Sequence, residues 1–232
     1  MKKQPWNDLM SRRNRLLGWI YLPIHVIALP LLMGLIYYAL TGREPDSLKM
    51  NIVYYGVGLA VMVLGMWTYL KESYRRVTEN ILGFFRGVFG AFVLNFALSL
   101  LYRAVTELAG QPPSPNQDLV EDLTIGNMNQ MFAMAVLMVP IVEECLFRGV
   151  IFGTIRRKHR ILAYVVCVAA FSLYHVWQYA VAAQDWTLLL GAVQYIPISV
   201  ALTYAYDRSG TIWAPIFLHM FNNALSLSLL GA

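Results

Sequence analysis

Charged side chains are scarce in this sequence. Only 13% of its 232 residues are Asp, Glu, Lys or Arg, whereas a soluble globular domain usually carries about a quarter. Long uncharged runs recur along the whole chain, and the mean hydropathy is +0.53. This composition argues against a soluble domain with one anchor. It predicts a polytopic membrane protein surrounded by lipid.

Cysteine is also rare, and basic residues are absent from most of the apolar runs. The two cysteines, Cys145 and Cys167, lie in apolar segments without a CxxC pair, which favours small core residues over a disulfide framework. The net charge of +5 comes mostly from short loops between apolar runs, so we expect no nucleic-acid partner. The first apolar run follows a basic start but is about 25 residues long, which predicts a retained helix rather than a signal peptide.

The apolar runs predict an all-α polytopic membrane bundle of about seven transmembrane helices. Each run has roughly 19 to 26 residues, enough to cross about 30 Å of hydrocarbon. We interpret residues 1–232 as a single membrane domain, with a motif-bearing core at about 130–225 and variable leading helices at 1–102. The predicted spans are 16–41, 52–70, 81–102, 131–153, 161–183, 186–205 and 211–231.

The distribution of basic residues predicts the orientation. Thirteen lie in the N-terminal segment and the even-numbered loops, against three in the odd-numbered loops. The positive-inside rule therefore places the N-terminus in the cytoplasm and the C-terminus outside. The thirteen are Lys2, Lys3, Arg12, Arg13, Arg15, Lys71, Arg75, Arg76, Arg156, Arg157, Lys158, Arg160 and Arg208, and the three are Arg43, Lys49 and Arg103.

A few ionisable residues lie inside the predicted spans. A charge at the centre of such a helix costs roughly 2.5–3.5 kcal/mol, so each one is a candidate for function. His25 stands alone in the first span and is interpreted as structural or partly hydrated. Arg86 lies near a membrane edge and can extend toward water. The remaining candidates are Glu143, Glu144, Arg148, His175 and His219.

Three of these candidates share one depth. Counted from the cytoplasmic edge of its span, Glu143 is about ten residues in, His175 about fourteen and His219 about eight. At 1.5 Å per residue they lie within roughly 9 Å of one another along the membrane normal. The spacing predicts that three helices converge on one polar pocket.

The spacing also separates the two adjacent glutamates. Glu144 and Arg148 are four residues apart and so lie on one helix face, where they can form a buried ion pair. Glu143 points elsewhere and has no such partner. We therefore expect Glu143 to face the pocket with the two histidines.

Two types of intramembrane protease are disfavoured because their motifs are missing. The chain has no HExxH pattern and no GxSG serine. Three ordered motifs instead resemble the CAAX-protease and bacteriocin-processing family, which includes type II CAAX prenyl endopeptidases. The resemblance covers roughly residues 130–225. The motifs are Glu143–Glu144–x–x–x–Arg148, Phe171–x–x–x–His175 and His219–x–x–x–Asn223.

The resemblance implies an α-helical intramembrane endopeptidase. Glu143 would activate the attacking water and His175 would help to bind it, while His219 and Asn223 would stabilise the oxyanion. A carboxylate suits a general base, and two donors one helical turn apart suit a developing charge. Zinc held by Glu143, His175 and His219 stays open, although we favour a mechanism without a tightly bound metal.

Our interpretation is therefore a peptidase of a bacterial cytoplasmic membrane that acts on a peptide or protein, which could carry a lipid. Two alternatives remain. One is a non-proteolytic scaffold or immunity protein of the same fold. The other is a small proton-coupled transporter, in which buried Glu and His are equally natural, although such proteins usually show paired halves.

Overall fold

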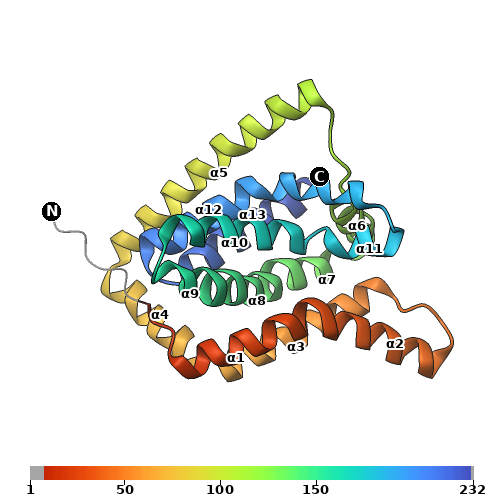
Figure 1. The fold of residues 1–232 in the computed structure, drawn as a ribbon, viewed down its shortest axis with the longest axis horizontal. Helices are drawn as coiled ribbons and strands as arrows, with labels where there is room; N and C mark the ends of the chain where they lie inside the picture. The colour runs from red at the N-terminus through yellow and green to blue at the C-terminus, as the bar shows by residue number, and fades with distance from the viewer. Residues whose placement is uncertain (1–7, 231–232) are drawn as a thin grey trace.

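A computed structural model describes residues 8–230, and every regular element in this range is a helix (Figure 1). The all-α prediction is confirmed. Lys2, Lys3 and the last residue of the predicted span 211–231 lie outside the described residues. The α-helices are α1 (Arg12–Pro23), α2 (Leu29–Thr41), α3 (Ser47–Gly65), α4 (Trp67–Glu79), α5 (Ile81–Ala109), α6 (Pro115–Thr124), α7 (Met128–Phe132), α8 (Val139–Glu144), α9 (Gly153–Arg156), α10 (Arg160–Tyr174), α11 (Trp177–Ala183), α12 (Ile196–Ser209) and α13 (Trp213–Leu230).

Four further segments have tighter or wider helical turns and continue these helices. Ile24–Ala28, Ala133–Met138 and Cys145–Phe152 are π-helical, and Trp186–Tyr195 is a 3₁₀ helix. Two of the π-helical segments join α7, α8 and α9 into one continuous run, which covers the predicted span 131–153. Because a π-helical turn changes the rotation of each residue about the axis, it re-aims side chains within such a run, and π-bulges are frequent at functional sites.

Polar residues at the ends of the apolar runs explain where several helices begin and end. The Ser11 hydroxyl accepts a hydrogen bond from the backbone N–H of Asn14 at 3.1 Å, and the Asp46 carboxylate accepts one from Lys49 at 3.0 Å. These side chains satisfy N–H groups that a helix start leaves without a partner. Gly210, with a φ of 68°, ends α12 in the left-handed conformation that glycine adopts without strain.

The described residues include four helices that are long and apolar enough to cross a membrane, or five when a bent pair is counted as one span. The four are Arg12–Thr41, Ser47–Gly65, Ile81–Ala109 and Trp186–Ser209, and the pair α10 and α11 is bent by 45°. The predicted spans 131–153 and 211–231 are helical but do not meet this criterion. Each of these two spans carries one of the three motifs. The polytopic bundle is therefore supported, and the count of seven stays a prediction.

Two predicted boundaries were wrong. The second span ends at Gly65 rather than near residue 70, and α4 begins at once with Trp67. The third span continues to Ala109, and the connection expected at 103–130 contains α6. Composition alone misplaced these boundaries because polar residues can continue a helix beyond its apolar part.

The continuous helical run made of α7, α8, α9 and the two π-helical segments between them lies at the centre of the bundle. Every residue from Val142 to Gly153 is buried, in contact with α3, α10, α12 and α13, while α5 packs along α12 on the far side (Figure 1). The core cluster contains residues of the leading helices, such as Met62 and Tyr69, together with Phe147 and Phe152. A helix buried on all sides reads as apolar all round, so the three charges in this run are conspicuous.

Candidate active site

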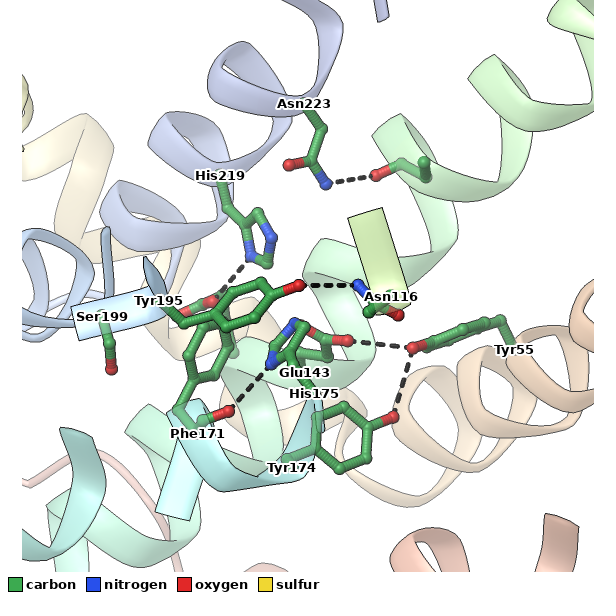
Figure 2. Close-up of polar contacts among 12 residues, drawn as sticks. Tyr55, Asn116, Glu143, Phe171, Tyr174, His175, Tyr195, Ser199, His219 and Asn223 are labelled. Carbon is green, nitrogen blue, oxygen red and sulfur yellow. Dashed lines mark hydrogen bonds and ion pairs between the residues drawn. The ribbon is translucent and has the colours of Figure 1, made fainter. Parts of the chain in front are cut away.

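Glu143 lies one residue before the end of α8, with its carboxyl group inside the bundle. Its side chain is 1% exposed, and its Oε1 accepts a hydrogen bond of 2.9 Å from the hydroxyl of Tyr55 on α3 (Figure 2). Its Oε2 has no hydrogen-bond partner among the described residues, and His175 Nε2 lies 3.9 Å away. One oxygen of this carboxylate is thus held and the other is unengaged.

Glu144 is the centre of a buried cluster of charges. Its Oε1 accepts from Arg148 Nη1 at 3.0 Å and from His219 Nδ1 at 2.8 Å. Arg148 is fully buried, donates to Ser199 Oγ at 3.1 Å and lies 4.0 Å above the ring of Phe171. The predicted Glu144–Arg148 ion pair is confirmed.

His175 immediately follows α10 and is fixed from two sides. Its Nδ1 lies 2.8 Å from the carbonyl oxygen of Phe171, and its ring stacks on Tyr195 with 4.2 Å between centroids. A carbonyl oxygen only accepts hydrogen bonds, so Nδ1 carries the proton. In the neutral ring Nε2 is then an acceptor, and it is the atom that faces Glu143.

His219 lies on α13 and contacts the other glutamate. Its Nδ1–H donates to Glu144, so Nε2 is an acceptor in the neutral ring and a donor only in the imidazolium. Asn223, one turn further along, donates from Nδ2 to the carbonyl oxygen of Ala135 at 2.8 Å. Its amide retains a second N–H.

A cavity of about 270 Å³ joins these side chains. Glu143, His175, His219 and Asn223 all line it, which confirms the predicted convergence of three helices on one polar pocket. The expectation that Glu143 faces this pocket with the two histidines is confirmed, and the hydrogen bond of His219 goes to the neighbouring Glu144. The catalytic roles of Glu143, Glu144, Arg148, His175, His219 and Asn223 stay predictions.

α6 lies beside the cavity and contributes part of its lining. Asn116 donates from Nδ2 to the Tyr195 hydroxyl at 3.0 Å (Figure 2). Its Oδ1 accepts from the Tyr179 hydroxyl at 3.2 Å. Ser114 donates to Gln194 Oε1 at 2.7 Å. The connection between α5 and α7 is therefore tied by side-chain hydrogen bonds to the segment that carries Tyr195.

Sequence reasoning missed the uncharged residues of the site. Tyr55, Asn116, Tyr174 and Tyr195 line the cavity or support its charged groups, and Ser199 binds Arg148. Tyrosine in an apolar helix is usually a core residue, so the sequence had no pattern to distinguish these hydroxyls. The only indication was the adjacent pair Tyr54–Tyr55 within a predicted span.

The histidine and the arginine that the sequence analysis set aside lie away from Glu143. His25 is fully buried, with Nδ1 3.3 Å from the Tyr21 hydroxyl, and lies outside the cavity lining. Arg86 is exposed on α5. Neither contacts Glu143.

The described side chains do not fit a three-ligand zinc site. No group of three or more His, Cys, Asp or Glu side chains between residues 8 and 230 is placed to hold a metal ion. His219 is engaged with Glu144 rather than grouped with Glu143 and His175. The reaction proposed for this site therefore uses no metal ion.

Comparison with known proteins finds a family match for the part of the chain that carries the three motifs. The family model described as "Type II CAAX prenyl endopeptidase Rce1-like" matches residues 126–225. This match confirms the resemblance seen in the three motifs. No solved structure is significantly similar to the chain.

Two curated bacterial proteins are similar over longer segments. The "Membrane-embedded CAAX protease MroQ" of Staphylococcus aureus (strain USA300) is 28% identical over 141 residues, which is 56% of this chain and 53% of MroQ. The "Putative membrane peptidase YdiL" of Bacillus subtilis (strain 168) is 25% identical over 209 residues, 85% of this chain and 80% of YdiL. The chain thus aligns with about half the length of MroQ and most of YdiL. Together with the apolar helices, these relatives support an integral membrane protein.

Proposed function

We propose that this chain, which carries an Rce1-like type II CAAX prenyl endopeptidase domain at residues 126–225, is an intramembrane endopeptidase in which Glu143 activates water. The observation that carries the proposal is the buried, unpartnered Oε2 of Glu143 beside the acceptor nitrogen of His175. A single buried acceptor without a donor requires explanation, and a water molecule supplies it.

The geometry of these two acceptors suits one water molecule. Oε2 and Nε2 lie 3.9 Å apart, and a water about 2.8 Å from each donates one O–H to each atom. Its oxygen lone pairs then point into the cavity. Glu143 is the base because its carboxylate can take a full proton, while His175 orients the water through the acceptor that the Phe171 carbonyl fixes.

The proposed reaction balances within this site. The water oxygen bonds to the peptide carbonyl carbon, and its proton moves to Glu143 Oε2. The resulting oxyanion accepts a hydrogen bond from the free N–H of Asn223, and also from His219 when that ring is an imidazolium. The C–N bond then breaks, and the proton passes from Glu143 to the leaving nitrogen.

The substrate class follows from the setting of the cavity. A peptide or protein segment is the proposed substrate, and a lipid attached to it remains compatible with a site inside the membrane. The names of the relatives include a CAAX protease and a membrane peptidase, which supports peptide hydrolysis.

We further propose one membrane domain in a bacterial cytoplasmic membrane, with the N-terminus in the cytoplasm. The asymmetry of basic loops supports this orientation. The shared core of Met62 and Phe147 and the Tyr55–Glu143 hydrogen bond support a single unit of leading and motif-bearing helices.

The test compares purified wild-type protein with Glu143→Gln on a peptide library, read by mass spectrometry. Gln keeps an acceptor for Tyr55 but cannot take the proton, so we expect loss of cleavage with unchanged folding. Glu107→Gln, on the exposed end of α5, is the matched control and should cleave normally. Cleavage by Glu143→Gln overturns the proposed mechanism, and absence of cleavage by the wild type favours the scaffold or transporter alternatives.

A further inference from the structure

A buried chain of hydroxyl groups connects Glu143 to the leading helices. The Tyr55 hydroxyl lies 2.9 Å from Glu143 Oε1 and 3.1 Å from the Tyr174 hydroxyl (Figure 2). The Tyr174 hydroxyl lies 3.1 Å from that of Tyr54 and 3.5 Å from His25 Nε2. These contacts bring together α3, the end of α10 and the π-helical turn after α1.

The number of hydrogens in this chain limits the direction of each bond. A carboxylate only accepts, so the single Tyr55 hydrogen points to Glu143. A carbonyl also only accepts, so the Tyr54 hydrogen goes to the backbone oxygen of His25 at 2.9 Å. Tyr174 is then the remaining donor for the Tyr55 oxygen.

His25 extends this chain and donates in the same direction. Its Nδ1 lies 3.3 Å from the Tyr21 hydroxyl, and its Nε2 faces Tyr174. With Tyr21 donating to Nδ1, the neutral ring carries its proton on Nε2 and donates to the Tyr174 oxygen. His25, Tyr174 and Tyr55 each then donate toward Glu143. The Tyr54 hydrogen points the other way, to the backbone oxygen of His25.

We propose that Tyr55 is a positioning residue for Glu143, and that Tyr174 and His25 hold Tyr55 in its donating orientation. The bond occupies Oε1 and fixes the rotation of the carboxylate, so Oε2 is left as the oxygen that faces His175. A hydrogen bond to a charged group inside a low-dielectric interior is among the stronger ones. This inference rests on the proposed role of Glu143.

The proposal assigns a function to a part of the chain that the family match does not cover. Tyr55 and His25 precede residue 126, where that match begins. The leading helices would then help to set the geometry of the base, in addition to forming the bundle. The proposal also assigns a role to His25, the lone histidine of the first predicted span.

The test measures kcat, KM and thermal unfolding for Tyr55→Phe in the full-length protein. We expect kcat to fall roughly 10- to 100-fold, the effect of losing a hydrogen bond to a charged group, with KM and Tm nearly unchanged. Tyr69→Phe is the matched control, because its buried hydroxyl bonds to that of Tyr206 and lies outside the cavity lining. It should keep kcat within about twofold, since it leaves the donor to Glu143 in place.

Tyr174→Phe is the second variant, since it removes the donor to Tyr55 without touching Glu143. We expect a smaller fall in kcat for this variant. If Tyr55→Phe does not fold, the kcat of Tyr174→Phe tests the inference in its place. Wild-type kcat in the folded variants, with Glu143→Gln inactive, overturns this inference and leaves the proposed function standing. Activity of Glu143→Gln instead overturns the proposed function itself.

Discussion

Glu144 Oε1 and His219 Nδ1 lie 2.8 Å apart, so the second glutamate, and not the first, holds the histidine of the last motif. The same oxygen accepts from Arg148 at 3.0 Å. The two adjacent glutamates therefore have different surroundings. Each glutamate retains an Oε2 without a hydrogen-bond partner among the described residues. Glu144 Oε1 holds Arg148 and His219, whereas Glu143 is the one of the two that lines the cavity.

The first prediction is that Glu144→Gln destabilises the fold. Arg148 is fully buried, and removing the charge of its partner leaves a guanidinium without compensation inside the bundle. Breaking a buried pair in this way typically costs about 3–5 kcal/mol. We expect a Tm lower by roughly 10 °C, measured by thermal unfolding in detergent, and a loss of activity that follows from unfolding and from the released His219.

Glu143→Gln is the control for that measurement. Its Oε2 makes no hydrogen bond among the described residues, and the Gln carbonyl can still accept from Tyr55, so its Tm should be unchanged or higher. If Glu144→Gln unfolds like the wild type but has no turnover while Glu143→Gln remains active, the two roles are exchanged.

The second prediction concerns metal. If hydrolysis depends on Glu143 and its neighbouring donors alone, a strong chelator should leave activity intact, and elemental analysis of the purified protein should find no stoichiometric zinc. The engagement of His219 with Glu144, and the lack of a three-ligand group between residues 8 and 230, support this expectation. Zinc near one per chain, with activity lost on chelation and restored by the metal, contradicts it.

The third prediction concerns topology. A reporter fused after Arg160 should read cytoplasmic, and one fused near Gln117 should read external, because thirteen basic residues lie on one predicted side and three on the other. Alkaline phosphatase and green fluorescent protein fusions read the two sides independently. The reverse pattern, or a C-terminus in the cytoplasm, contradicts the seven-span topology.

The fold class and the identity of the motif helices could be predicted from the sequence, because long apolar runs and misplaced charges have few structural explanations. The convergence of Glu143, His175 and His219 followed from axial depth alone. The partner of His219 could not be predicted in the same way. Depth along the membrane normal says nothing about rotation around a helix axis, and that rotation decides which of two adjacent glutamates faces His219.

The supporting tyrosines could not be predicted for a different reason. Tyr55, Tyr174 and Tyr195 carry no charge, and their contacts join residues far apart in the chain, such as Tyr55 with Glu143. Only tertiary structure distinguishes such a hydroxyl from an ordinary core ring. The Glu144–Arg148 pair could be predicted because both residues lie on one helix at a fixed spacing.

The last prediction separates two contributions of Tyr195. Its ring stacks on His175 at 4.2 Å, and its hydroxyl accepts from Asn116 on α6. Tyr195→Phe keeps the ring and removes the acceptor, so kcat should stay within about threefold while the tie to α6 is lost. Tyr195→Ala removes the ring that holds His175, and stacking of this kind contributes about 0.5–1.5 kcal/mol, so kcat should fall roughly threefold to tenfold further.

Steady-state kinetics on one cleaved peptide distinguish these effects. A loosened α6 should appear in KM, because this helix forms part of the cavity lining, whereas a mobile His175 should appear in kcat. Asn116→Ala is the matched control, because it breaks the tie to α6 from the other side and should behave like Tyr195→Phe. Equal kcat for Tyr195→Phe and Tyr195→Ala shows that the ring does not position His175, and the water-binding role of that histidine must then rest on its bond to the Phe171 carbonyl alone.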